Sequence, residues 1–136
     1  MDIRKKFLSA QLFLFAFCAS AYAGWTPADG LRLKSPDKKI EISVNQDADG
    51  LFYTVKKGKT SVLDKSPLGI IVDGNDLGKG VSFVDEPEIT KIDEEYPIFG
   101  NHAMAEDKAV EAWVSLEASG VRYGLVVRAY NDGVAV

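Results

Sequence analysis

His102 is the only histidine of this 136-residue chain, and imidazole is the side chain best suited to move a proton or bind a metal near neutral pH. A metal site usually needs several His, Cys or carboxylate ligands, and only Glu106 and Asp107 lie close to His102 in the sequence. A catalytic triad cannot be recognised from spacing alone. The sequence therefore leaves two interpretations open: His102 is a loop or packing residue, or it belongs to a site.

The 20 acidic residues could supply acid–base chemistry, because glycosidic bonds are hydrolysed by two carboxyl groups held a fixed distance apart. Spacing does not reveal such a pair. The densest acidic run is Asp93-Glu94-Glu95. Adjacent residues of a strand point to opposite faces, so these carboxylates would not converge. We interpret the run as a solvated face.

The glycine-rich stretch 73–80 partly matches a calcium-binding loop. Asp73, Asn75 and Gly78 occupy the first, third and sixth positions of such a loop. Leu77 stands at the fifth position and Val84 where a bidentate glutamate is needed, and neither can bind the ion. We therefore interpret the stretch as a structural turn.

Trp25 and Trp113 are the candidates for sugar binding by stacking, because the C–H face of a sugar ring can pack on an apolar indole. Within the alternating stretch 110–117, Trp113 falls on the face of Glu111 and Ser115, opposite Val114. An exposed tryptophan on a strand indicates a ligand surface or a domain interface. In a two-sided sandwich the same residue could belong to the core, so all three interpretations stay open.

Most of the chain alternates apolar and polar residues with the period of two that predicts β-strands. We predict strands or strand-like apolar runs at 31–33, 39–45, 51–56, 60–63, 68–72, 81–84, 110–117, 121–130 and 134–136. The stretch 89–96 is either an edge strand or a loop, and 103–108 could be helix or strand because Ala, Glu and Lys favour helices. Short strands joined by Asp/Gly turns, without a long amphipathic helix, predict an all-β antiparallel sandwich.

Residues 1–23 have the three parts of a secretory signal peptide. Residues 1–6 are short and basic, 7–20 are apolar or small, and Ala21-Tyr22-Ala23 is an A-x-A cleavage site. The apolar run is too short for a comfortable membrane span. We expect cleavage after Ala23, leaving a domain over 24–136 that is periplasmic or secreted and not attached to a membrane. The alternative is an uncleaved N-terminal anchor.

The expected mature segment is acidic and lacks cysteine. The only cysteine, Cys18, lies within the signal, so residues 24–136 cannot form a disulfide. Removing Arg4, Lys5, Lys6 and Asp2 from the chain's 16 basic and 20 acidic residues leaves 13 and 19, a net charge of −6. Without a basic stripe, nucleic acid and anionic membrane surfaces are disfavoured as partners.

The segments from Leu33 to Val136 resemble, in the same order, the N-terminal domain of glycoside hydrolase family 97, the exported bacterial α-glucosidases and α-galactosidases. The matching segments are SPDKKIEISV (35–44), LFYTVKKGKTSVL (51–63), SPLGIIVDGNDLG (66–78), the pair Asn101-His102, and YGLVVRAYNDGVAV (123–136). The last two are the more specific.

The resemblance implies a β-sandwich of the galactose-mutarotase-like type, followed in the intact enzyme by a catalytic (β/α)₈ barrel and a small β-domain. It also implies a calcium ion near the active site, held by the barrel and by a later part of the N-terminal domain. No catalytic or metal-binding residue is therefore assigned in this chain. Asn101 and His102 match a recurrent pair of the family and are, with Trp113, the candidate carbohydrate contacts. Family members continue into a full strand after Val134, so we expect a sandwich that is incomplete at the C-terminus.

Two functional hypotheses follow from the sequence. In the first, the chain is a carbohydrate-associated N-terminal module of a family 97 glycoside hydrolase and has no activity alone. Its partners would be an oligosaccharide or α-glycoside substrate and the barrel of the intact protein. In the second, it is a stand-alone exported β-sandwich for binding or adhesion. A metal-dependent enzyme is disfavoured by the scarcity of ligands.

Overall fold

The computed structural model describes residues 25–99 and 104–136. The signal peptide, its cleavage site and the pair Asn101-His102 lie outside these residues. Within the described ranges, no helix is long and apolar enough to cross a membrane.

The first sheet contains four antiparallel strands in chain order: β1 (Leu31–Lys34), β2 (Ile40–Asp47), β3 (Gly50–Lys57) and β4 (Thr60–Pro67). A short 3-10 helix, η1 (Pro27–Asp29), precedes it. The alternation predicted for β2 is observed, with Ile40, Ile42 and Val44 all buried. The period of two sends these side chains to the same face of the sheet.

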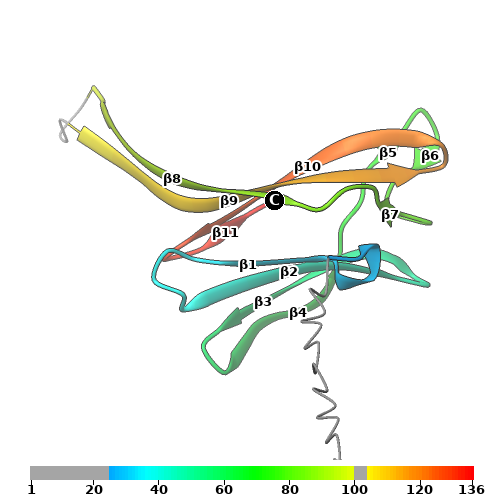
Figure 1. The fold of residues 1–136 in the computed structure, drawn as a ribbon, viewed down its shortest axis with the longest axis horizontal. Helices are drawn as coiled ribbons and strands as arrows, with labels where there is room; N and C mark the ends of the chain where they lie inside the picture. Colours follow the sequence, from blue (N-terminus) through cyan, green and yellow to red (C-terminus); the bar gives the residue numbers. More distant parts are fainter. Residues whose placement is uncertain (1–24, 100–103) are drawn as a thin grey trace, which may run out of the picture.

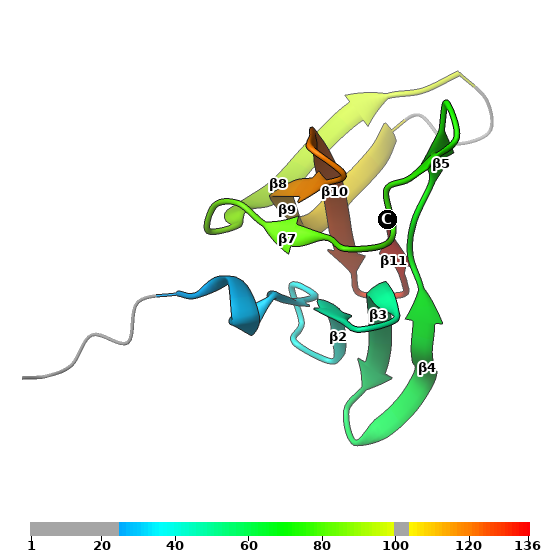
Figure 2. The same ribbon diagram turned by 90° about the vertical axis from the view of Figure 1, so that its right-hand side faces the viewer.

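The second sheet is organised around its longest strand, β9 (Met104–Ala118). On one side β9 pairs with β10 (Val121–Tyr130), which pairs in turn with β11 (Val134–Ala135). On its other side β9 pairs with β8 (Glu88–Pro97) and with the short β7 (Ser82–Phe83). A separate small hairpin joins β5 (Ile71–Val72) and β6 (Asn75–Asp76). Figures 1 and 2 show the two large sheets facing each other.

The core lies between the two sheets. Its largest fully buried apolar side chains come from β1 and β2 on one side and from β9 and β10 on the other: Leu31, Leu33, Ile42, Val44, Val114, Leu116 and Val127. Burial of this kind contributes about 1.5–3 kcal/mol for each large aliphatic side chain. The predicted all-β antiparallel sandwich is confirmed.

A hydrogen-bonded network links the β1–β2 turn to the turn after β10. The buried hydroxyl of Ser35 donates to Asp37 Oδ1 over 2.6 Å and accepts from the amide of Ile40 over 3.0 Å. The amide of Asp37 donates to Asn131 Oδ1 over 2.9 Å. The Asn-Asp-Gly turn at 131–133 therefore joins β10 to β11 and also connects the two sheets.

The structure settles two stretches that the sequence left open, and it corrects the predicted end of one strand. The stretch 104–108 is strand, because β8 supplies hydrogen-bonding partners along its whole length and overrides the helix propensity of Ala, Glu and Lys. The stretch 89–96 is the edge strand β8. β4 continues to Pro67, beyond the predicted end at residue 63.

The apolar run 68–72 is not a buried strand. Only Ile71 and Val72 are in a strand, and they are 71% and 44% exposed. Asp73 and Gly74, with φ of 50° and 80°, reverse the chain immediately into β6. Two successive residues with positive φ favour a tight hairpin, so the run ends before it can join a large sheet.

Candidate functional site

Trp113 lies on the outer face of the second sheet, where its side chain is 49% exposed. Its partner in the adjacent strand is Val126, and the next pair along the same face joins Ser115 to Gly124. The sandwich core is on the opposite face, so the interpretation of Trp113 as a core residue is wrong. The interpretations as a domain interface or a sugar platform remain.

The indole of Trp113 lies directly over Gly124. A Cβ atom placed at position 124 would be 2.6 Å from Trp113 Cη2 and 2.9 Å from Cε2, closer than real Cβ contacts. Only glycine leaves room for the ring to approach the backbone of β10 this closely. The ring is thereby held against the sheet by one strand while it remains half exposed.

A cavity of about 270 Å³ adjoins this ring. It is lined by Val84, Asp85, Trp113, Ser115, Leu116, Arg122, Tyr123 and Gly124. Asp85 can accept hydrogen bonds, Arg122 can donate them, and Ser115 can do both. An apolar ring beside a few polar groups is the composition of a small-molecule site, and sugar hydroxyls would find partners here.

Two ion pairs flank Trp113 on the same face. Arg122 Nε lies 2.9 Å from Glu117 Oε2, and Arg128 Nε lies 2.6 Å from Glu111 Oε2. Hydrogen bonds that Arg128 donates to the Tyr130 hydroxyl and to the Glu111 carboxylate raise the pKa of Arg128 above its usual range. The exposed ring of Trp113 is therefore bordered by an ion pair on either side.

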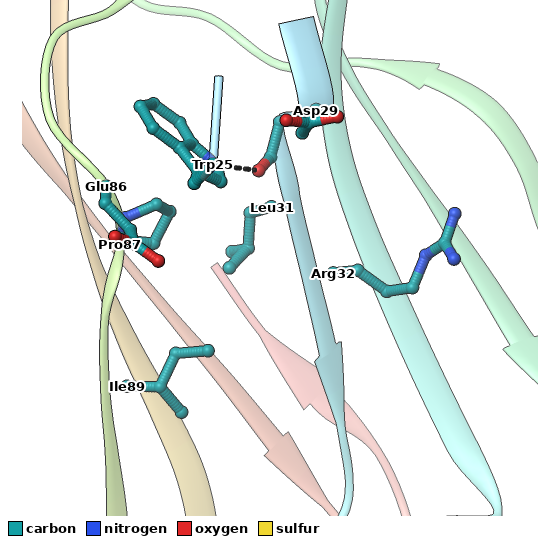
Figure 3. Close-up of a pocket in the computed structure, with 8 residues that line it drawn as sticks. Trp25, Asp29, Leu31, Arg32, Glu86, Pro87 and Ile89 are labelled. Atoms are coloured by element: carbon teal, nitrogen blue, oxygen red, sulfur yellow. Dashed lines mark hydrogen bonds between the residues drawn. The ribbon is translucent and has the colours of Figure 1, made fainter. Parts of the chain in front are cut away.

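A second cavity, of about 350 Å³, lies near the N-terminus of the described chain. Figure 3 shows Trp25 and Leu31 on one side of it and Glu86, Pro87 and Ile89 on the other. Arg32 and Asp29 complete the polar part of its lining.

The groups in this second cavity are largely occupied by structural contacts. The indole N–H of Trp25 donates to the carbonyl of Gly30 over 3.0 Å, and the ring packs edge-on against Phe83 with centroids 6.3 Å apart. The carboxylate of Asp29 accepts from the amide and the hydroxyl of Thr26 over 2.6 and 2.8 Å, which lowers its pKa. A glycosidase proton donor needs a raised pKa, so Asp29 is unsuited to that role.

Of the three predicted carbohydrate contacts, the structure places only Trp113. Asn101 and His102 lie outside the described residues, so their relation to Trp113 stays a prediction. The acidic run Asp93-Glu94-Glu95 is exposed on β8, as the interpretation of a solvated face requires.

The loop at 73–80 does not fit a calcium ion. Asp76 Oδ1 accepts from the amide of Gly78 over 2.9 Å, and Asp76 Oδ2 lies 3.5 Å from Lys79 Nζ. Across the described ranges, no group of three or more His, Cys, Asp and Glu side chains is arranged to hold a metal ion. The calcium ion implied by the resemblance stays a prediction for the intact enzyme.

Sequence reasoning placed Ser115 on the face of Trp113 but missed Asp85, Arg122 and Gly124 as its neighbours. One signal was available, because a glycine inside an alternating strand often marks a close approach. The identity of the approaching group depends on the β9–β10 register, which pairs Ser115 with Gly124. Asp85 lies in the connection between β7 and β8. No feature of the sequence marks it as a neighbour of Trp113.

Comparison with known protein families places most of the chain in one family. The family described as glycosyl-hydrolase 97 N-terminal matches residues 33–136. A probable retaining alpha-galactosidase of Streptomyces bingchenggensis (strain BCW-1) is 26% identical over 129 residues, which are 94% of this chain and 20% of that protein. The chain thus spans about a fifth of the length of this curated relative.

Solved structures show the same fold. A glycoside hydrolase family 97 enzyme from Pseudoalteromonas sp. strain K8, solved in complex with acarbose, superimposes with a TM-score of 0.68 at 17% identity, covering 76% of this chain and 16% of that one. A beta-arabinopyranosidase superimposes with a TM-score of 0.66 at 26% identity, covering 74% of this chain and 16% of that one.

Proposed function

Because this chain belongs to the glycosyl hydrolase 97 N-terminal family, we propose that it is the non-catalytic β-sandwich module of a family 97 glycoside hydrolase and holds carbohydrate on its Trp113 face. The substrate of the intact enzyme is an α-glucoside or α-galactoside. Its partner within that enzyme is a catalytic (β/α)₈ barrel, which carries the catalytic carboxylates and takes part in binding calcium. The module acts in the periplasm or outside the cell.

The observation that carries this proposal is the half-exposed indole of Trp113 held against Gly124. A ring fixed by the strand beneath it needs little further ordering when a sugar stacks on it. Binding therefore loses less conformational entropy than it would on a mobile ring. Asp85, Ser115 and Arg122 line the adjoining cavity and can bond the hydroxyl groups at the edge of the sugar.

Nuclear magnetic resonance can locate the contact. The ¹⁵N-labelled protein is titrated with maltotriose as an α-glucoside and with melibiose as an α-galactoside. We expect the largest shift changes at the Trp113 indole N–H and at the amides of Asp85, Ser115 and Gly124. Changes confined to Trp25, or none with either sugar, would reject the Trp113 face as a carbohydrate site.

The proposal also states that this chain does not hydrolyse glycosides alone. Its support is that the chain spans about a fifth of the relative that is named as a probable enzyme. Purified protein is incubated with aryl α-glucosides and aryl α-galactosides. We expect no release of the aryl alcohol above buffer, and turnover that survives repeated purification would contradict a non-catalytic module.

The same face has a second candidate use, which is contact with another domain of the enzyme. Trp113 and Val126 are paired across the strands and are 49% and 37% exposed, so they form a small apolar patch. A packed domain would bury both residues and exclude sugar. The titration distinguishes the two uses, because a purely structural interface gives no shift change with either oligosaccharide.

A further inference from the structure

The cavity beside Trp113 has a floor made by two small residues. Ser115 and Gly124 face each other across β9 and β10, on the outer face of the second sheet. Both line the cavity of about 270 Å³, and the pairs on either side of them carry larger side chains. A glycine within a strand leaves space for another group to approach the backbone. The floor is therefore a place where a ligand can come close to the sheet.

Larger side chains close both ends of this floor along the strands. Trp113 lies two residues before Ser115, and Glu117, two residues after it, pairs with Arg122. Residues four positions apart in a strand are separated by about 13 Å. Contact distances of about 4 Å at each end then leave about 5 Å between the two walls. This length accommodates one six-membered sugar ring, and not two in line.

The cavity is also bounded across the strands. On the β7 side, the amide of Val84 donates to the carbonyl of Ser115 over 2.9 Å, so the connection that contains Asp85 runs beside the floor. On the β10 side, the indole of Trp113 lies over Gly124. A longer β11 would pair with the edge of β10 that faces away from β9, outside this wall. All the walls therefore come from β9, β10 and the connection after β7.

Arg122 is the hydrogen-bond donor at the end of the cavity opposite Trp113. Among the residues that the structure describes, its guanidinium makes one hydrogen bond, from Nε to Glu117 Oε2 over 2.9 Å. A guanidinium carries several N–H donors in a fixed fork, so this bond leaves donors for adjacent hydroxyl groups of a sugar. The carboxylate of Asp85 adds acceptors to the same cavity. Glu117 acts as a positioning residue, because its bond to Nε orients the fork.

We propose that this cavity binds a single terminal sugar unit, an inference that rests on the proposed binding of carbohydrate by the Trp113 face. The unit lies between the indole and the Arg122–Glu117 ion pair, with its hydroxyl groups bonded by Arg122, Asp85 and Ser115. The rest of the glycoside points away from the sheet, because a sugar chain laid along the strands would meet a wall at each end. The ligand class is therefore a monosaccharide glycoside or the end of a chain, and not the interior of a polysaccharide.

The second ion pair on this face provides a comparison. Arg128 pairs with Glu111 on the other side of the indole and does not line the cavity. Its guanidinium also lies 3.5 Å from Asp107 and bonds the hydroxyl of Tyr130 over 3.4 Å, so protein groups occupy it. A sugar unit in the cavity therefore contacts Arg122 and not Arg128.

Isothermal titration calorimetry with ligands of increasing length tests the proposal. One series is methyl α-glucoside, maltose, maltotriose and maltoheptaose, and the other is methyl α-galactoside and melibiose. In the series that binds, we expect affinities within about threefold of one another, because only the terminal unit makes contact. A surface that held several units would gain about tenfold or more between the shortest and the longest ligand.

Three variants locate the bound unit. Arg122→Met keeps most of the side-chain stem but removes the donors, and it weakens binding by about tenfold, the effect of losing hydrogen bonds to a charged group. Arg128→Met is the matched control and leaves the affinity unchanged. Ser115→Leu fills the floor and abolishes binding although Trp113 remains. Circular dichroism confirms that each variant is folded, and Arg122→Lys with Arg128→Lys gives the same comparison with milder changes.

The outcomes separate the two claims about this face. If the unmodified protein binds neither series, the carbohydrate function of the Trp113 face is overturned, and the terminal-unit cavity with it. The cavity alone is overturned if binding requires Trp113 but strengthens tenfold or more with chain length. It is also overturned if Arg122→Met and Ser115→Leu bind like the unmodified protein, or if Arg128→Met loses as much affinity as Arg122→Met.

Discussion

Replacing Gly124 by alanine tests whether the position of Trp113 depends on the glycine beneath it. The new Cβ would stand 2.6 Å from Trp113 Cη2 and 2.9 Å from Cε2, so the ring must leave the strand. Crowding of this kind costs about 1–3 kcal/mol, and we expect the lower end because the ring is half exposed and can turn away. Alanine in a strand recovers about 0.5–1 kcal/mol relative to glycine. The expected net loss of stability is therefore about 0–2 kcal/mol.

The assay is urea unfolding in a double-mutant cycle with Trp113→Ala. Without the indole, the three atoms nearest to the new Cβ are gone, so Gly124→Ala in that background is neutral or stabilising by about 0.5 kcal/mol. The interaction energy between the two positions isolates the contact. Equal destabilisation by Gly124→Ala in both backgrounds would refute the reasoning, since the cost would then come from the backbone of β10.

Three further changes probe the sandwich itself. Leu116→Ala removes a fully buried side chain and lowers the free energy of unfolding by about 2–5 kcal/mol in urea melts. Gly50→Ala places a Cβ against the carbonyl of Gly78 at a φ of 126°, so strain and crowding together should cost about 2–5 kcal/mol in the same assay. The Ser35 hydroxyl bond lowers the pKa of Asp37, so the stability from this carboxylate is present near neutrality and is lost as pH falls through its folded-state pKa. Melts between pH 6 and pH 2 should therefore be less pH-dependent for Asp37→Asn, and an unchanged pH dependence would contradict this.

The sequence predicted the elements in which one face is buried. Apolar residues alternate in β2, β9 and β10, because the period of two sends every second side chain into the core. The outer part of β8 could not be predicted in the same way. Residues 93–97 are exposed on both sides of the strand and include three consecutive carboxylates, so the stretch has no buried apolar face to mark it as strand. Its structure comes from pairing with β9, which the sequence of this stretch alone does not contain.

The candidate site, like the fold, could be predicted from the sequence only in part. Alternation placed Trp113 on the face of Glu111 and Ser115, opposite Val114, and the structure shows that this face is the outer one. The distance between the indole and Gly124 depends on the register between two strands, which the sequence of one strand does not contain. Asp85 is still further away along the chain, and only the paths of β7 and β8 beside β9 bring it near the ring.

The central claim is that Trp113 holds carbohydrate, and the most direct measurement is isothermal titration calorimetry with maltotriose and melibiose. The unmodified protein is compared with Trp113→Ala and with Trp113→Phe, which keeps an aromatic face. We predict measurable binding of at least one sugar, a loss of about tenfold or more in affinity for Trp113→Ala, and an intermediate affinity for Trp113→Phe. Equal affinity of the three proteins, with folding confirmed by circular dichroism, would contradict the account.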